Sequence, residues 1–217
     1  MSTPGNAGPR PDTERNHEHE PKGWHSRGYL PHFDSIHVLQ SITFRLADSI
    51  AQETLRQLKD ELKQLPSSVQ KRERRQQIER WLDAGMGCCA LKHPEVATVM
   101  METLQKFDPE RYRLIAWCIM PNHVHVLIAP TVSLTRIVRS WKSYTGRWAM
   151  SKNAELGLGV PGKAFWMRDY WDRYIRDENH FTQVVDYIHD NPVKAGLCRE
   201  PEEWPWSSAR TDTSFNL

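Results

Sequence analysis

Apolar side chains recur along this chain of 217 residues at two spacings, one typical of strands and the other of helices. Dense or alternating apolar and aromatic residues predict strands at 35–46, 112–120, 123–130 and 164–177. Helical spacing predicts helices at 50–65, 94–107, 134–150 and 178–191, and the basic segment 71–82 also has a helical pattern. The predicted order is strand, helices, strand, strand, helix, strand, helix.

This order predicts an α+β fold with a β-α-β-β-α-β core, which is the pattern of a ferredoxin-like antiparallel sheet with helices on one face. We expect an extra helical insertion at about 66–110 and a C-terminal catalytic helix. Local signals indicate where the helices begin and end. Asp48 and Ser49 mark the start of the first helix, and Ser133 is the predicted N-cap of the helix at 134–150. Pro192 lies just beyond the predicted end of the last helix.

The chain ends differ in composition from the middle. Residues 1–27 contain few large apolar side chains, so we expect a flexible N-terminal arm, followed by one catalytic domain at 28–210 and a flexible tail at 211–217. No apolar run is long enough to cross a bilayer, and the first residues lack the apolar stretch of a signal peptide. We therefore expect a cytoplasmic protein that does not bind membranes.

The amino-acid composition excludes few classes of function. The net charge of +2 does not by itself predict binding to nucleic acid, although a local basic face is compatible with it. The four cysteines have neither disulfide-framework nor zinc-site spacing, so they are interpreted as reduced thiols. Nine tryptophans suit stacking on unpaired bases, but an aromatic core is the commoner explanation.

Two histidines and one tyrosine are the candidate chemical groups. His123 and His125 are two apart on a predicted strand, so their imidazoles project from one face and could share a metal ion. Tyr187 and Asn191 are four apart on a predicted helix and share a face as well. A tyrosine that attacks a phosphodiester needs a cation, and imidazole with amide oxygen suits Mg²⁺ or Mn²⁺. The alternative is that the histidines are half-buried structural residues, Tyr187 belongs to the core and Asn191 is a helix cap.

Three runs of sequence resemble a known family. MPNHVHVLI resembles the HUH histidine motif of the transposases of small bacterial insertion sequences that move as single strands. VVDYIHDNPVKAG, followed by EEWPWSS, resembles the REP-associated tyrosine transposases, as does FWMRDYWDRYIRDENHF between them. The resemblance spans Ser35 to Ser208 and is weakest through the helical insertion.

The resemblance implies a role for each candidate residue. Tyr187 would be the nucleophile that forms a 5′-phosphotyrosine link and frees a 3′-hydroxyl, and His123 and His125 would be metal ligands. Asn191 matches the position of a third ligand, where related insertion-sequence enzymes have glutamine. Such enzymes cut and rejoin single-stranded DNA at the foot of repetitive extragenic palindromic (REP) hairpins. The partner would be single-stranded DNA with palindromic hairpins, and we expect a monomer, with a dimer as the alternative.

DNA binding would require cationic side chains along the strand. The candidates are Arg136, Arg139, Lys142, Arg147, Arg168, Arg173 and Arg176. Each of them could equally be a solvated charge or an ion-pair partner. Tyr144 is a rival nucleophile, but the residue four positions later is Trp148, which cannot ligate a metal.

Three other functions remain open. The protein could bind DNA hairpins without cleaving them, or be a zinc hydrolase in which a bound water attacks, which would need a carboxylate that the strand pair does not supply. A purely structural role would leave the pairing of the tyrosine motif with the histidines unexplained.

Overall fold

The computed structural model describes residues 23–26 and 31–210, so the predicted tail at 211–217 and most of the predicted arm lie outside the described residues. The arm was expected to extend to residue 27, but 23–26 form strand β1 (Gly23–Ser26), which pairs antiparallel with β2 (Pro31–Asp34). Trp24 explains the difference, because its ring packs 5.2 Å from that of Phe33.

Four strands form the central antiparallel sheet. They are β3 (Gln40–Arg45), β4 (Tyr112–Ile119), β5 (His123–Pro130) and β6 (Trp171–Tyr174). Their order in the sheet is β4-β5-β3-β6, which places the first and third strands of the core side by side at the centre. The predicted ferredoxin-like sheet is confirmed.

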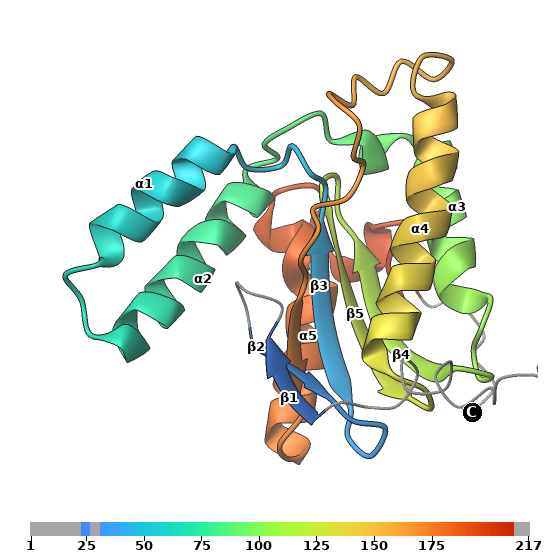
Figure 1. The fold of residues 1–217 in the computed structure, drawn as a ribbon. Coiled ribbons are helices and arrows are strands. Elements are labelled where there is room, and N and C mark those ends of the chain that lie inside the picture. Colours follow the sequence, from blue (N-terminus) through green and yellow to red (C-terminus); the bar gives the residue numbers. More distant parts are fainter. Residues whose placement is uncertain (1–22, 27–30, 211–217) are drawn as a thin grey trace, which may run out of the picture.

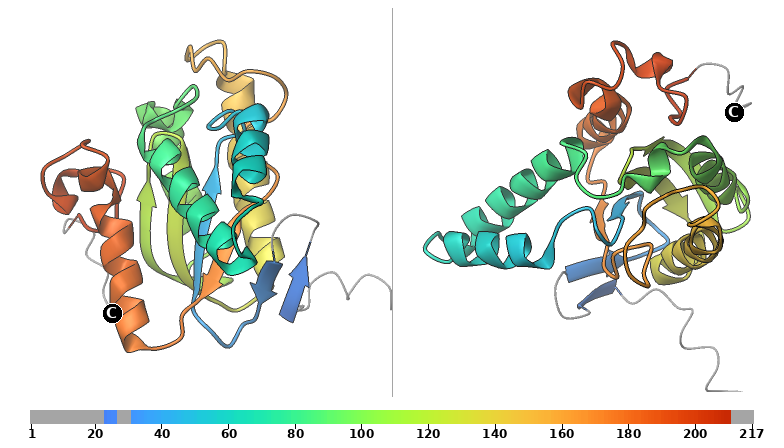
Figure 2. Two further views of the ribbon diagram at one scale, coloured as in Figure 1. Left: turned by 90° about the vertical axis from the view of Figure 1, so that its left-hand side faces the viewer. Right: turned by 90° about the horizontal axis from the view of Figure 1, so that it is seen from above.

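Helices cover both faces of this sheet (Figures 1 and 2). On one face α3 (Pro94–Gln105) and α4 (Leu134–Lys152) pack over the main core. On the other face α5 (Glu178–Lys194) packs against a smaller cluster that includes Leu127 and Ile188. Short 3₁₀ turns at Ala90–Lys92 and Pro201–Glu203 precede α3 and follow α5. The core helices thus share one face as predicted, and the C-terminal helix lies alone on the other.

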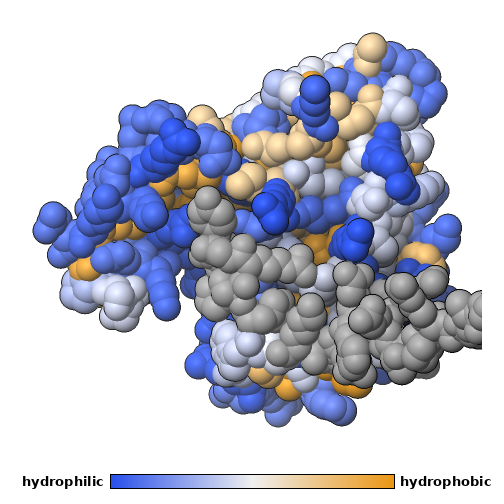
Figure 3. All heavy atoms as spheres, viewed as in Figure 1, coloured by the Kyte–Doolittle hydropathy of each residue, from blue (hydrophilic) through white to orange (hydrophobic). Residues whose placement is uncertain are grey.

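A helical hairpin projects from the edge of the sheet. It consists of α1 (Gln52–Leu62) and α2 (Ser67–Asp83), which hold a separate apolar cluster between them. In Figure 3 the outer surface of this hairpin is hydrophilic, and apolar side chains show between its two helices. The sequence placed the insertion at about 66–110, but here the added element is α1 with α2. The helix that covers the sheet between the first two core strands is α3, because Val96, Met100 and Leu104 face the main core.

The structure corrects several predicted boundaries. The first strand begins at Gln40 rather than 35, and the first helix begins at Gln52 because the two predicted start residues have other partners. Ser49 bonds to the side chain of Arg45, and the Asp48 carboxylate accepts the backbone N–H of Cys88 (2.6 Å). The aromatic segment 164–177 is a strand over 171–174, where it pairs with β3.

The last helix also departs from the prediction. It continues through Pro192 to Lys194, although the proline has no N–H to donate to the preceding turn. Gly196, with φ of +69°, follows the helix end in the left-handed region, where glycine is favoured.

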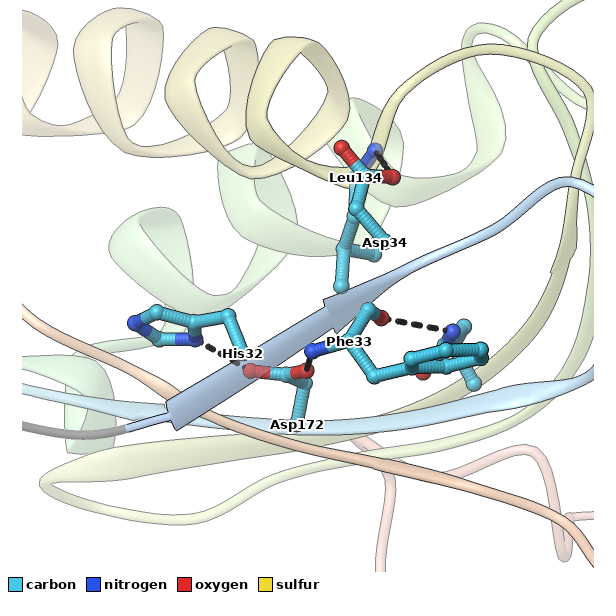
Figure 4. A network of polar contacts seen from close by, with 6 residues as sticks. His32, Phe33, Asp34, Leu134 and Asp172 are labelled. Carbon is cyan, nitrogen blue, oxygen red and sulfur yellow. Dashed lines mark hydrogen bonds and ion pairs between the residues drawn. The ribbon is translucent and has the colours of Figure 1, made fainter. Parts of the chain in front are cut away.

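A polar network anchors the β1–β2 hairpin to the sheet (Figure 4). The carboxylate of Asp172 on β6 accepts hydrogen bonds from the His32 ring and from the backbone N–H of Phe33. Asp34 accepts the N–H of Leu134 at 2.8 Å and so caps α4 from a distant part of the chain. The predicted N-cap, Ser133, makes no side-chain cap bond. The cap is therefore tertiary rather than local.

Two predictions from composition can be compared with the structure. All four cysteines are free thiols, as expected. None of the helices in the described part of the chain has the length and apolar character needed to span a bilayer.

Candidate active site

The two histidines of β5 converge on one point. His123 and His125 project from the sheet face that α5 covers, and their Nε2 atoms lie 2.9 Å apart. Both side chains are buried, with 1% and 3% of their surface exposed. The prediction that strand spacing would place the imidazoles side by side is confirmed.

The surroundings of the pair favour neutral rings with free Nε2 lone pairs. Burial lowers the pKa of His125 to about 3, and burial together with His125 lowers the pKa of His123 well below its ordinary value. The Nδ1 atom of His123 faces Oδ1 of Asn122 at 2.7 Å, and that of His125 faces Oγ1 of Thr43 at 2.8 Å. When each Nδ1–H donates to these oxygens, both Nε2 atoms can accept a metal ion.

The spacing of the Nε2 atoms suits a divalent cation. With metal–nitrogen distances of about 2.1 Å, neighbouring ligands of an octahedral ion lie about 3.0 Å apart, and those of a tetrahedral ion about 3.4 Å. The observed 2.9 Å fits the octahedral case. Across 23–26 and 31–210, no three His, Cys, Asp or Glu side chains are arranged to hold a metal ion. Any third protein ligand in this range would therefore be of another kind, such as an amide.

The tyrosine of α5 lies against this pair. The rings of Tyr187 and His125 meet edge to face, with centroids 5.3 Å apart. Burial raises the pKa of Tyr187, and the nearby carboxylates of Glu79 and Asp83 on α2 raise it further. The hydroxyl is therefore protonated at neutral pH in the metal-free protein.

Asn191 sits one helical turn after the tyrosine, with 1% of its surface exposed. Its Nδ2 donates to the backbone carbonyl of Tyr187 at 2.6 Å, and its side chain also forms a hydrogen bond with the Tyr187 hydroxyl, while Oδ1 is an acceptor. A buried amide oxygen on the helix that packs over the histidines is compatible with a third metal ligand.

The other candidates from the sequence lie elsewhere. Tyr144 is 51% exposed on α4, across the sheet from the histidines, so the rival nucleophile is separated from the histidine pair. His189 faces Ser208 (2.9 Å), and Asp190 forms an ion pair with Lys194 (3.6 Å), so neither is directed to the pair.

The predicted DNA-binding residues form two groups. Arg139, Lys142, Arg147 and Arg168 line a cavity of about 520 Å³ between α4 and residues 163–170, with Arg136 exposed on the same helix. Arg173 and Arg176 form the second group and do not line this cavity. They are exposed, one on β6 and the other just beyond its end. The ammonium of Lys142 is held by the carbonyls of Met167 and Arg168, so it joins that segment to α4.

Sequence reasoning missed the residues that support the site. Asn122 directly precedes the first histidine and could have been noticed in the MPNHVH run. Thr43 carried no signal, because its contact with His125 arises from the register of β3 against β5. Glu79 and Asp83 lie in the helical hairpin, and only the fold brings them near Tyr187.

Comparison with known proteins agrees with this geometry. Residues 91–191, which contain both histidines, Tyr187 and Asn191, match the family model described as "Transposase IS200 like". The resemblance read from the three sequence runs is confirmed.

Individual relatives point the same way. The REP-associated tyrosine transposase of Escherichia coli is 26% identical over 107 residues, covering 49% of this chain and 59% of that protein. A Haemophilus influenzae protein provisionally named as a REP-associated tyrosine transposase is 27% identical over 117 residues, covering 49% of this chain and 64% of that protein. The chain thus spans about three-fifths of the length of these relatives.

A solved structure supports the fold. It is described as a REP-associated tyrosine transposase bound to a REP hairpin, and it superposes with a TM-score of 0.50 at 17% identity, covering 88% of this chain and 87% of that one. At this identity the match bears on the fold alone.

Proposed function

We propose that this protein cleaves and rejoins single-stranded DNA at palindromic hairpins, in the manner of a tyrosine transposase. The observation that carries the proposal is the position of the Tyr187 ring against His125, within the segment that matches the transposase family. A purely structural role would give no reason for a tyrosine to lie beside two converging neutral imidazoles.

Tyr187 acts as the nucleophile in this proposal. Its hydroxyl oxygen forms a bond to phosphorus while the bond from phosphorus to the 3′-oxygen breaks, giving a 5′-phosphotyrosine and a 3′-hydroxyl. The proton lost by the phenol balances the proton gained by the leaving oxygen. Joining is the reverse reaction with a second 3′-hydroxyl, so it needs no external energy source.

His123, His125 and Asn191 would hold a divalent cation, Mg²⁺ or Mn²⁺. When bound, the cation polarises the scissile phosphate and stabilises the charge that develops on it. The protein residues keep both imidazoles neutral and oriented, and they hold the phenol beside them. Because the pKa of Tyr187 is raised, the phenol is protonated at neutral pH and must lose its proton when it attacks.

The hairpin partner is proposed from the relatives and from the basic surface. One relative of the same fold was solved with a REP hairpin. The cationic side chains along α4 and residues 163–170 supply the kind of surface that grips a DNA backbone.

A covalent-adduct assay tests the proposal. The protein is incubated with Mn²⁺ or Mg²⁺ and a labelled single-stranded oligonucleotide that carries a palindrome from its own genome, and adducts are resolved under denaturing conditions. We expect an adduct that requires the metal and is absent from Tyr187→Phe. Tyr144→Phe is the matched control, because that exposed tyrosine lies on the other side of the sheet and should leave the adduct unchanged.

Two results would contradict the proposal. If native palindromes bind but give neither adduct nor cleavage, the protein is a hairpin-binding protein without catalysis. If DNA is cleaved by Tyr187→Phe as fast as by the unaltered protein, a metal-bound water rather than the tyrosine is the nucleophile.

A further inference from the structure

A second cavity lies beside the candidate active site, at the edge of the sheet. It has a volume of about 520 Å³ and is enclosed by the α1–α2 hairpin, the end of β3 and residues 167–171. Pockets that bind small ligands are typically about 300–1,000 Å³, so the space can hold one nucleotide. Arg168 is one of the cationic DNA-binding candidates from the sequence, and the other four basic residues that line the cavity are not among those candidates.

The lining of this cavity is strongly cationic. Five basic side chains and one carboxylate, that of Asp169, line it; the basic residues are Arg45, Arg56, Lys59, Arg74 and Arg168. Arg56 pairs with Glu53, but among the described residues no carboxylate lies within 4.0 Å of the guanidinium of Arg45 or Arg74.

The side chain of Arg45 and part of that of Arg74 are also shielded from water. Arg45 is 4% exposed, and among the described residues its side chain makes one hydrogen bond, from Nη1 to Oγ of Ser49 (2.8 Å). The Nε of Arg74 is buried and has no hydrogen-bond partner among the described residues. Burial and the neighbouring charge of Arg74 lower the pKa of Arg45 to about 10, although the carboxylate of Asp169 acts in the opposite direction. An anion in the cavity would relieve both the repulsion and the missing hydrogen bonds.

The cavity is next to the histidine pair. Arg45 is directly opposite His123 in the β3–β5 register, and directly opposed residues project from the same face of a sheet. Thr43, which also lines the cavity, contacts His125 at 2.8 Å. Trp171 forms an aromatic wall and packs against the hairpin. Arg168 lines this cavity and also the one beside α4, so the two are neighbours.

We propose that this cavity holds one nucleotide of the DNA strand next to the phosphate that is cut, with Arg45 and Arg74 binding its phosphate and Trp171 contacting its base. This inference rests on the proposed function. Aromatic rings beside cationic groups are the usual means of holding single strands. The strand would run from the basic face of α4, past Arg168, into the site of cleavage, and the α1–α2 hairpin would serve to position it.

Arg74→Gln is the primary test, because this residue is only partly buried and its removal leaves no partner unsatisfied. Arg72→Gln is the matched control on the same helix; this residue is exposed and does not line the cavity. Binding of a single-stranded oligonucleotide is measured by fluorescence anisotropy in EDTA over a range of salt concentrations. We expect Arg74→Gln to weaken binding about tenfold and to reduce the salt slope by about 0.7, the loss of one phosphate contact.

The position of the contact is tested with the DNA. Uncharged methylphosphonates replace the phosphates next to the cut one at a time. At one position, the methylphosphonate should weaken binding by the unaltered protein and by Arg72→Gln. It should have little further effect on Arg74→Gln, because the methylphosphonate and the Arg74→Gln substitution remove the same contact.

The outcomes separate this inference from the proposed function. Suppose the protein forms the metal-dependent adduct, but Arg74→Gln binds DNA as tightly as Arg72→Gln, or every methylphosphonate weakens binding by Arg74→Gln as much as binding by the unaltered protein. The nucleotide site is then refuted and the proposed function stands. If the unaltered protein neither binds the strand nor forms an adduct, both are refuted.

Discussion

Replacing Thr43 by valine tests the proposal that His125 binds a metal ion with its ring held in place by Thr43. The substitution keeps the shape of the side chain and removes the oxygen that faces Nδ1 of His125 at 2.8 Å. Loss of such a supporting contact typically weakens metal binding about 10–100-fold, or about 1.4–2.7 kcal/mol. His125 is 3% exposed, so water cannot easily replace the lost partner. An unpaired buried donor of this kind costs about 1–3 kcal/mol of stability.

Mn²⁺ binding in the absence of DNA provides the measurement, by isothermal titration calorimetry. Working without DNA keeps the result independent of the nucleotide cavity, which Thr43 also lines. We expect a Kd raised about 10–100-fold. Thermal unfolding of the metal-free protein should occur about 4–8 °C lower, if the stability cost is about 2 kcal/mol in a protein of this size.

Thr145→Val is the matched control. Thr145 is a buried threonine on α4 that also makes two side-chain hydrogen bonds, to the carbonyl of Trp141 (2.7 Å) and from the indole of Trp166 (2.9 Å). It should lower the unfolding temperature without changing the Kd for Mn²⁺. The reasoning would be refuted if folded Thr43→Val bound Mn²⁺ as tightly as the unaltered protein, or if both variants weakened it equally.

Two further predictions concern stability. Because the pKa of His125 falls from 6.5 to about 3 on folding and that of His123 is also lowered, the unfolded chain binds more protons below pH 6.5. Urea unfolding of the metal-free protein should therefore show stability falling by about 1.4 kcal/mol per pH unit per histidine as the pH drops below 6.5, and an unchanged slope in a His123→Gln, His125→Gln double variant would contradict this. Asp34→Ala, which removes the tertiary cap of α4, should cost about 1–2 kcal/mol, whereas Ser133→Ala should change stability by less than about 0.5 kcal/mol because Ser133 makes no cap bond. Equal thermal shifts for the two variants would show that Ser133 carries the cap after all.

The sequence by itself determined the local geometry of the site. Side chains repeat every two residues along a strand, which placed His123 and His125 on one face of β5. They repeat about every four residues along a helix, which placed Tyr187 and Asn191 on one face of α5. The strand order followed from the same periodicities, since a β-α-β-β-α-β chain with short connections has few ways to form a sheet. Both inferences depend only on residues close together in the chain.

Tertiary structure alone decided what surrounds these residues. Thr43 reaches His125 through strand register, Asp34 caps α4 across 100 residues of chain, and Arg45 meets Arg74 only because the α1–α2 hairpin folds back over the edge of the sheet. The start of the first helix was misplaced for the same reason. Asp48 and Ser49 are residue types that often cap helices, but their side-chain oxygens accept hydrogen bonds from the backbone of Cys88 and the side chain of Arg45 instead. Hydrogen bonds between residues far apart in the chain leave no periodic signal, because their geometry is set by packing rather than by spacing.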